Sequence, residues 1–258
     1  MLDPGRLHSL RRQVAQIETA GVPHPTDAQA LRLGIDALDA ALGGGLALGA
    51  VHEIGPAAPL HVGATVGFGV ALAALAARHK PALWIVQDYA AGEAGLPYGP
   101  GLALFGLAMR RLIILRVAQS RDALWAMEEA LKSGAVAVVL AELARDGAGT
   151  DLTTTRRLSL AAAEGGALGL ILRHHASHHP SAATTRWQVA AAPSRRDAFG
   201  GLGPAAFALS LVKNRRGPTG PWLLSWDHHE RAFVATLSVG VAQAARDRSG
   251  RAPRVRAG

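Results

Sequence analysis

The stretch that decides the fold runs from Leu33 to Asp88 and reads LGIDALDAALGGGLALGAVHEIGPAAPLHVGATVGFGVALAALAARHKPALWIVQD. It predicts a short helix, a glycine turn, a strand, a loop, an apolar helix and a second strand. That order is the opening βαβ unit of a nucleotide-binding α/β core. The loop from Gly55 to Thr65 falls where such folds hold a phosphate. The residues in this loop therefore bear directly on function.

The rest of the chain continues the alternation of strands and helices through residue 172. This pattern is typical of a mostly parallel sheet covered by helices on both faces. Two later apolar segments joined by KNRRGPTGP predict an antiparallel hairpin, because glycine and proline occupy turn positions. We expect one three-layer α/β domain over residues 31–240, with antiparallel strands at one edge. The predicted strands are 51–54, 83–86, 112–117, 135–140, 167–172, 186–190, 207–212, 222–226 and 231–237; the predicted helices are 35–42, 66–77, 102–109, 120–133 and 151–164, with a loop at 90–101.

Composition and charge restrict the chemistry. The chain has no cysteine, which excludes disulfides, thiolate nucleophiles and cysteine metal sites. Its 27 basic and 19 acidic residues give a net charge of +8, which favours acidic partners such as nucleic acid. High-GC coding that enriches arginine and alanine would give the same balance, so both explanations stay open. The apolar run Val66 to Ala77 is too short to span a bilayer, and we expect a cytoplasmic protein with no membrane partner.

The loop GPAAPLHVGAT lacks the residues that a phosphate-binding loop uses. Such a loop needs a lysine to neutralise the phosphates and a serine or threonine to hold Mg²⁺. His61 or Val62 stands near the lysine position, and Pro59 removes one backbone N–H from the cradle. Since phosphoryl transfer depends on positioned charge, we expect no competent ATP hydrolysis and no nucleotide cofactor.

Three separated segments resemble the RecA-like recombinases. LGIDALDAALGGGLALGAVHEIGP is similar to the family's approach to its phosphate loop, SGAVAVVLAEL to the strand with the metal-orienting acid, and LVKNRRGP to a late basic hairpin. The resemblance covers residues 31–235. Within that superfamily the match is best to the ImuA group, on LxxGxxALDAALGGGLxxGxxHEI, a loop without GK[ST], and SLxKNRRGPxGxWxLxWD.

The resemblance implies a RecA-like fold and an accessory role in error-prone translesion synthesis. The implied partners are an inactive Y-family polymerase homologue and an alternative replicative polymerase. RecA and single-stranded DNA are further candidate partners. Our leading hypothesis is a non-catalytic adaptor of this complex. The alternatives are a divergent DNA-stimulated ATPase with an altered loop, and a regulator or inhibitor of the RecA filament.

Two acids lie where the recombinases keep catalytic acids. Asp88 follows the strand LWIVQ, at the place of the water-activating glutamate, and Glu142 ends AVAVVLAE, at the place of the metal-orienting aspartate. The simpler interpretation is that both are ordinary polar residues at strand ends. We favour it, because a carboxylate cannot position Mg²⁺ usefully without a phosphate to share it.

The basic hairpin is the other candidate site. Lys213, Asn214, Arg215 and Arg216 resemble the family's lysines that reach a neighbouring subunit's nucleotide. Without a nucleotide, their charge could serve a partner or a DNA backbone, and a solvated hairpin tip is an equally weighted alternative.

The histidine patch RHHASHHP follows an apolar strand, in a region that leads into a DNA-binding loop in recombinases. Histidines four residues apart would bind zinc on a helix, but Pro180 and the preceding strand argue against a helix. We predict a polar loop and no metal site here. The four histidines are His174, His175, His178 and His179.

Both ends are expected to lie outside the domain. Residues 1–20 predict an amphipathic helix, residues 21–30 a linker, and residues 241–258 a basic flexible tail. By resemblance, the helix is a candidate for self-association through Leu7, Leu10, Val14 and Ile17. The tail is a candidate for partner or DNA contact through Arg246, Arg248, Arg251, Arg254 and Arg256.

Overall fold

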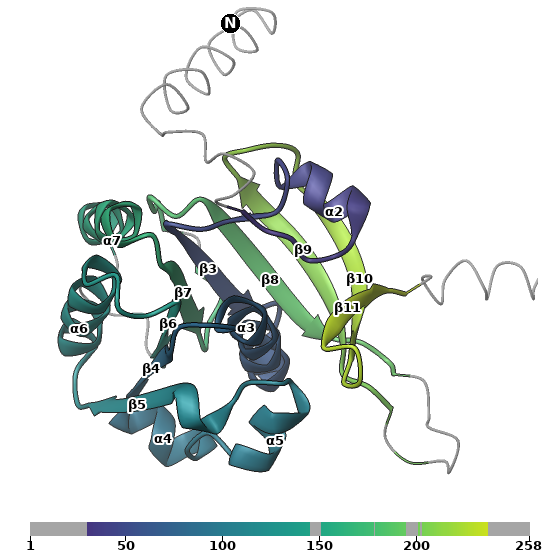
Figure 1. The fold of residues 1–258 in the computed structure, drawn as a ribbon, viewed down its shortest axis with the longest axis horizontal. Coiled ribbons are helices and arrows are strands. Elements are labelled where there is room, and N and C mark those ends of the chain that lie inside the picture. The colour runs from purple at the N-terminus through teal and green to yellow at the C-terminus, as the bar shows by residue number, and fades with distance from the viewer. Residues whose placement is uncertain (1–29, 145–150, 178, 195–200, 202, 237–258) are drawn as a thin grey trace, which may run out of the picture.

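A nine-stranded sheet runs through the part of the chain that the computed structural model describes, namely residues 30–144, 151–177, 179–194, 201 and 203–236 (Figure 1). In order across the sheet, the strands are β11 (Ala232–Ala235), β10 (Gly220–Asp227), β9 (Ala206–Asn214), β8 (Thr185–Ala191), β3 (Ala50–Pro56), β7 (Leu168–Arg173), β6 (Val138–Leu143), β4 (Ala82–Gln87) and β5 (Leu112–Val117).

The sheet has a parallel part and an antiparallel part. The strands from β5 to β8 all pair in parallel, with Ile54 of β3 opposite Leu172 of β7 and Trp187 of β8. Strands β9, β10 and β11 then extend the sheet by antiparallel pairing. The predicted mostly parallel sheet with antiparallel edge strands is confirmed.

Helices cover both faces of the sheet. Helix α3 (Val62–Ala76) packs against β8, β3, β7 and β6, whereas α6 (Ser120–Lys132) and α7 (Leu152–Gly165) lie together on the other face (Figure 1). Asp151 caps α7, because its carboxylate accepts the Thr154 N–H at 2.8 Å. The remaining elements are the small sheet β1 (Ala30–Leu31) and β2 (Leu46–Ala47), helices α2 (Asp36–Ala41), α4 (Asp88–Ala94) and α5 (Gly99–Leu104), and the 3₁₀ turns η2 (Pro59–His61) and η3 (Met109–Arg111).

Helix α3 is the central core helix. Its Phe68 ring lies 5.7 Å from Trp187, 5.9 Å from Phe207 and 5.6 Å from Phe233. Four aromatic rings thereby gather between α3 and strands β8, β9 and β11. The run Pro59–Ala76 is long and apolar enough to cross a membrane by length and composition. Its packing against four strands is that of a buried core helix.

The opening motif LGID…LGGG is held by one buried carboxylate and by left-handed glycines. Asp39 accepts the N–H groups of Leu33 at 2.8 Å and Gly34 at 3.0 Å, which fixes the start of α2. The turn after α2 has φ values of +70°, +103° and +135° at residues 43–45. At Gly45 a Cβ would lie 2.7 Å from the Leu31 carbonyl oxygen, so only glycine fits there.

Some predicted boundaries were wrong. The core helix begins at Val62 rather than residue 66, β6 begins at Val138 rather than 135, and the expected loop 90–101 contains α4 and the start of α5. The helix predicted for 102–109 was also wrong, because Gly106 adopts a φ of +82° and ends it. The predicted helix 1–20, linker residues 21–29 and tail 241–258 lie outside the described residues.

Candidate functional site

The loop at the phosphate position is a short turn. Gly55 and Pro56 are the last two residues of strand β3. The turn η2 then leads directly into α3, whose first residue is Val62. The His61 ring accepts the Ala191 N–H on Nδ1 at 3.3 Å, and Leu60 stands 80% exposed. Neither the lysine position nor the hydroxyl position carries a group that could neutralise a phosphate or hold Mg²⁺.

The two candidate acids are held by other parts of the protein. Glu142 is only 6% exposed, and its two oxygens accept the Trp84 indole N–H at 3.1 Å and the His174 Nε2–H at 2.8 Å. Asp88 is at the surface and pairs with the Arg116 guanidinium on the neighbouring strand β5 at 2.7 Å. These contacts are structural, and they leave Glu142 little access to a metal-bound water.

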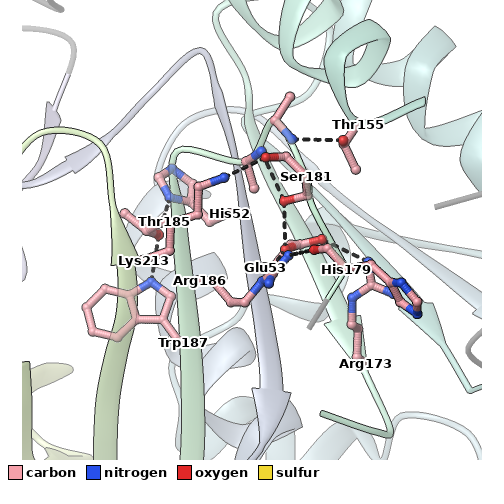
Figure 2. A network of polar contacts seen from close by, with 12 residues as sticks. His52, Glu53, Thr155, Arg173, His179, Ser181, Thr185, Arg186, Trp187 and Lys213 are labelled. Carbon is pink, nitrogen blue, oxygen red and sulfur yellow. Dashed lines mark hydrogen bonds and ion pairs between the residues drawn. The ribbon is translucent and has the colours of Figure 1, made fainter. Parts of the chain in front are cut away.

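A buried cluster of charged residues surrounds Glu53, in the middle of β3 (Figure 2). This carboxylate is 1% exposed, and it accepts from Arg173 of β7 at 2.8 Å, from Arg186 of β8 at 2.7 Å and from the Ser181 hydroxyl at 2.9 Å. Arg186 also donates to the His179 carbonyl at 2.6 Å. One buried carboxylate thus ties three strands to the β7–β8 connection.

The arginines determine the charge state of Glu53. Burial alone would raise the pKa of this carboxyl, but the guanidinium groups of Arg173 and Arg186 outweigh burial and hold the pKa below its ordinary value. Glu53 is therefore ionised in the folded protein. Its negative charge in turn offsets the two guanidinium charges that lie beside it, which lowers the cost of burying all three groups.

A second buried chain of hydrogen bonds starts at the neighbouring residue, His52 (Figure 2). His52 Nε2–H donates to the Ala47 carbonyl at 2.9 Å, so Nδ1 accepts the Thr185 hydroxyl at 2.7 Å. The Trp187 indole donates to the same Thr185 oxygen at 2.7 Å. Burial is the main reason why the pKa of His52 is lowered to about 4. The hydrogen bond to the Ala47 carbonyl raises this pKa, and the positive charge of Arg216 lowers it further. The ring is neutral at physiological pH.

The basic hairpin docks on the glycine turn that follows α2. Arg216 donates to the carbonyls of Gly43 at 2.6 Å and Gly45 at 3.2 Å, and Asn214 donates to the Ala41 carbonyl at 2.8 Å. The two motifs GGG and KNRRG, which lie about 170 residues apart in sequence, therefore meet in the fold.

The hairpin charges are only half exposed. Lys213 Nζ donates to the Ser181 carbonyl at 2.5 Å, and the Arg215 N–H donates to the Thr184 carbonyl at 3.0 Å. All four residues from Lys213 to Arg216 are intermediate in exposure. This arrangement differs from a solvated hairpin tip, and it gives the side chains of Lys213, Asn214 and Arg216 a structural role. The predicted contact with DNA or a partner stays a prediction.

Gly217 offers a test of this docking. A Cβ at this position would overlap the Ala41 carbonyl oxygen, whereas a Cβ on Gly220 would meet nothing within 4 Å. We expect Gly217→Ala to lower the free energy of unfolding by about 1–3 kcal/mol, the usual range for overpacking. Gly220→Ala, the matched control, should stay within about 0.5 kcal/mol of the wild type. Urea unfolding measures both, and equal midpoints for the two variants would contradict the docking.

The histidines of the sequence RHHASHHP lie partly in the interior and partly at the surface of the protein. His174 is buried against Glu142, whereas His175 and His179 are exposed, and His178 lies outside the described residues. Within the part of the chain that the structure describes, no three potential metal ligands come together. His228, at the β10–β11 turn, hydrogen-bonds through Nδ1 to the Leu104 carbonyl at 2.9 Å.

Several structurally central residues were missed from the sequence. Sequence patterns alone predict no role for Glu53, Arg173 or Arg186, although each is a charged residue in or at the end of a strand that is mostly buried or half-buried. A charge in a buried strand requires a partner. This requirement is the feature of the sequence that could have identified these residues. The candidate self-association residues Leu7, Leu10, Val14 and Ile17, and the five tail arginines, lie outside the described residues.

Known proteins resemble this chain in sequence and in fold, although no protein-family model matches it. Two relatives called Protein ImuA, from two strains of Caulobacter vibrioides, are each 33% identical over 221 residues, which is 80% of this chain and 86% of the relative. The crystal structure of the RadB recombinase superposes with a TM-score of 0.55 at 17% identity, over 80% of this chain and 100% of that one. The structural likeness shows a RecA-like fold, and the sequence identity shows that the chain belongs to the ImuA family.

Proposed function

We propose that this protein is a non-catalytic, RecA-like adaptor of an error-prone translesion synthesis complex in the cytoplasm. Its ImuA family membership and its fold support an accessory role in mutagenesis. The proposed partner is the Y-family polymerase-like protein of that complex, working with an alternative replicative polymerase. RecA and single-stranded DNA are further proposed contacts.

One observation carries the non-catalytic part of the proposal. The η2 turn from Pro59 to His61 replaces the phosphate cradle, while the sheet around it keeps the RecA-like arrangement. No lysine stands at the start of α3, and the one hydroxyl of its first turn, that of Thr65, is buried and donates to the His61 carbonyl at 3.1 Å. The Glu142 oxygens are occupied by Trp84 and His174. A fold that keeps its framework but lacks these groups is suited to binding rather than to phosphoryl transfer.

Strand β5 supports the adaptor part. It is the last strand of the sheet and pairs only with β4 among the described residues. Ile113, Ile114 and Leu115 are 51%, 40% and 38% exposed. An exposed edge with a row of aliphatic side chains is a ready site for strand addition by another chain. We place the polymerase-like partner on this edge.

Co-purification tests the adaptor. The full chain, expressed with the polymerase-like partner, is expected to retain it, and Ile113→Lys should reduce retention by about tenfold or more, because an exposed lysine opposes edge pairing. Leu160→Lys on α7 is the matched control, since Leu160 is also exposed, at 64%, but lies away from the edge. Equal retention by both variants would remove β5 as the partner site.

The ATPase alternative gives a different result with the same protein. The adaptor should show no ATP turnover above background, with or without single-stranded DNA. Turnover that disappears in Glu142→Gln would overturn the non-catalytic proposal, because it would place Glu142 in the chemistry rather than in the Trp84–His174 contact.

A further inference from the structure

A second candidate site lies away from the remodelled phosphate loop. An open pocket of about 330 Å³ is bordered by the end of α3, the segment from Phe105 through η3, and the β10–β11 turn. Its charged lining consists of Arg78, Arg110, Arg111 and Arg231 with one acid, Glu230. Three separate parts of the chain thus bring four guanidinium groups and a single carboxylate to one hollow.

No acidic side chain among the described residues forms an ion pair with these four arginines. In the described part of the chain, the guanidinium groups of Arg78, Arg110 and Arg231 form no ion pair or hydrogen bond. Arg111 donates only to the carbonyl of Arg78, at the end of α3. Like charges gathered in one pocket repel one another, and a bound anion relieves that repulsion.

Arg231 is held over the pocket by an unusual backbone. It has a φ of +52°, and it is the one non-glycine residue with a positive φ among those described. The Asp227 carboxylate fixes the turn, because it accepts the N–H groups of His229 at 2.8 Å and Glu230 at 3.0 Å. The Asp227-fixed turn therefore sets the direction from which Arg231 reaches the pocket.

The opposite wall is shaped to receive Arg231. Gly106 faces the Arg231 side chain so closely that a Cβ there would lie 2.6 Å from the Arg231 Cδ. Gly106 also has a φ of +82°, which favours glycine. The half-buried Phe105 beside it packs on Trp226 at 5.8 Å and edge-on against His228 at 6.1 Å. The pocket therefore has a firm apolar side and a basic side.

We propose that this pocket binds a phosphate group, either of a free nucleotide or of a nucleic-acid strand. Arginine is the side chain that binds phosphate oxygens in pairs of hydrogen bonds, and the hollow has room for more than the phosphate alone. An acidic peptide would place a carboxylate at the same position. A carboxylate offers two oxygens in one plane, whereas a phosphate offers oxygens in several directions and can therefore bind guanidinium groups that come from different sides. The proposal does not depend on the adaptor role.

Binding measurements on the full chain test the site with three probes: inorganic phosphate, adenosine monophosphate and a short single-stranded oligonucleotide. We expect Arg110→Ala and Arg231→Gly each to weaken binding by roughly tenfold or more. For the oligonucleotide, each should also reduce the slope of log affinity against log salt by about one. Binding of the free phosphates would identify a nucleotide site, and binding of the oligonucleotide alone would identify a strand-backbone site.

Two further variants separate binding from folding. Arg231→Gly relieves the positive φ, so its urea midpoint should equal or exceed that of the wild type while its phosphate binding falls. Glu230→Gln removes the single acid and should tighten binding severalfold. Arg121→Ala, an exposed arginine on α6, is the matched control and should change nothing.

The proposal is overturned if none of the three probes binds in the millimolar range, or if Arg231→Gly and Glu230→Gln bind like the wild type. A polyglutamate peptide that binds where the phosphates fail, with the same loss in Arg110→Ala, would also overturn it and assign the pocket to an acidic protein.

Discussion

Glu53→Gln is expected to lower the free energy of unfolding by about 3–5 kcal/mol, the range for breaking a buried ion pair by removing one partner. The amide keeps the shape of the side chain but removes the charge. Arg173 and Arg186, which are 4% and 14% exposed at their side chains, would then lose the negative charge that both of them contact on β3.

The loss should spread beyond β3. The Ser181 hydroxyl donates to Glu53, and the Ser181 carbonyl accepts from Lys213 at 2.5 Å, so the β7–β8 connection and the basic hairpin share this cluster. Hydrogen exchange should therefore show increased opening of residues 179–186 in the variant, in addition to the global loss.

Urea unfolding at neutral pH measures the effect. Asp88→Asn is the matched control: it makes the same chemical change in the exposed pair with Arg116, and surface pairs contribute about 0–1 kcal/mol. If Glu53→Gln proves as mild as Asp88→Asn, the buried cluster does not have the central role that its geometry indicates.

The second large effect is a loss of stability in mild acid that comes from His52. Its pKa is lowered from the ordinary 6.5 to about 4 by burial. Between these values the unfolded chain binds a proton that the folded protein excludes, so the free energy of unfolding falls as the pH decreases. The difference between 6.5 and about 4 corresponds to about 3 kcal/mol, fully present above pH 6.5 and lost by about pH 4.

Glu53 contributes to the pH dependence of stability in a separate and lower pH range. Because its folded pKa lies below the ordinary 4.5, its stabilisation is present above pH 4.5 and disappears as the pH falls through the folded value. Measurements between pH 7 and pH 5 therefore report on His52 without the contribution of Glu53.

Urea midpoints at several pH values in this range check the prediction. His52→Gln keeps groups that can bond to Ala47 and Thr185 but cannot take up a proton. It should start less stable at pH 7 and lose less stability toward pH 5 than the wild type. His175→Gln, at an exposed histidine, is the control. A His52→Gln profile parallel to that of the wild type would show that His52 is not the cause.

Much of the framework follows from local sequence patterns. Apolar runs such as AVAVVL predict buried strands, and the glycine and proline pattern in KNRRGPTGP predicts the hairpin between β9 and β10. The missing lysine in the phosphate loop is also a local fact, since it concerns which residues follow one strand. Boundaries were less predictable: Gly106 ended a helix whose apolar spacing continued past it.

The roles of the charged residues depend on strand order. Glu53 meets Arg173, Ser181 and Arg186 across 120, 128 and 133 residues of sequence, and no local pattern indicates which strands become neighbours. For the same reason, the hairpin was predicted from its turn residues, but its contact with the glycine turn at residues 43–45 was not.

The amino-acid order alone therefore establishes the α/β class, the family resemblance and the loss of the phosphate-binding groups, because period, turn chemistry and residue type are local properties. The packed fold assigns Glu142 to Trp84 and His174, docks the basic hairpin on a glycine turn, and gathers four arginines around one pocket. Those assignments arise only in three dimensions, because each joins segments that the sheet brings together from distant parts of the chain.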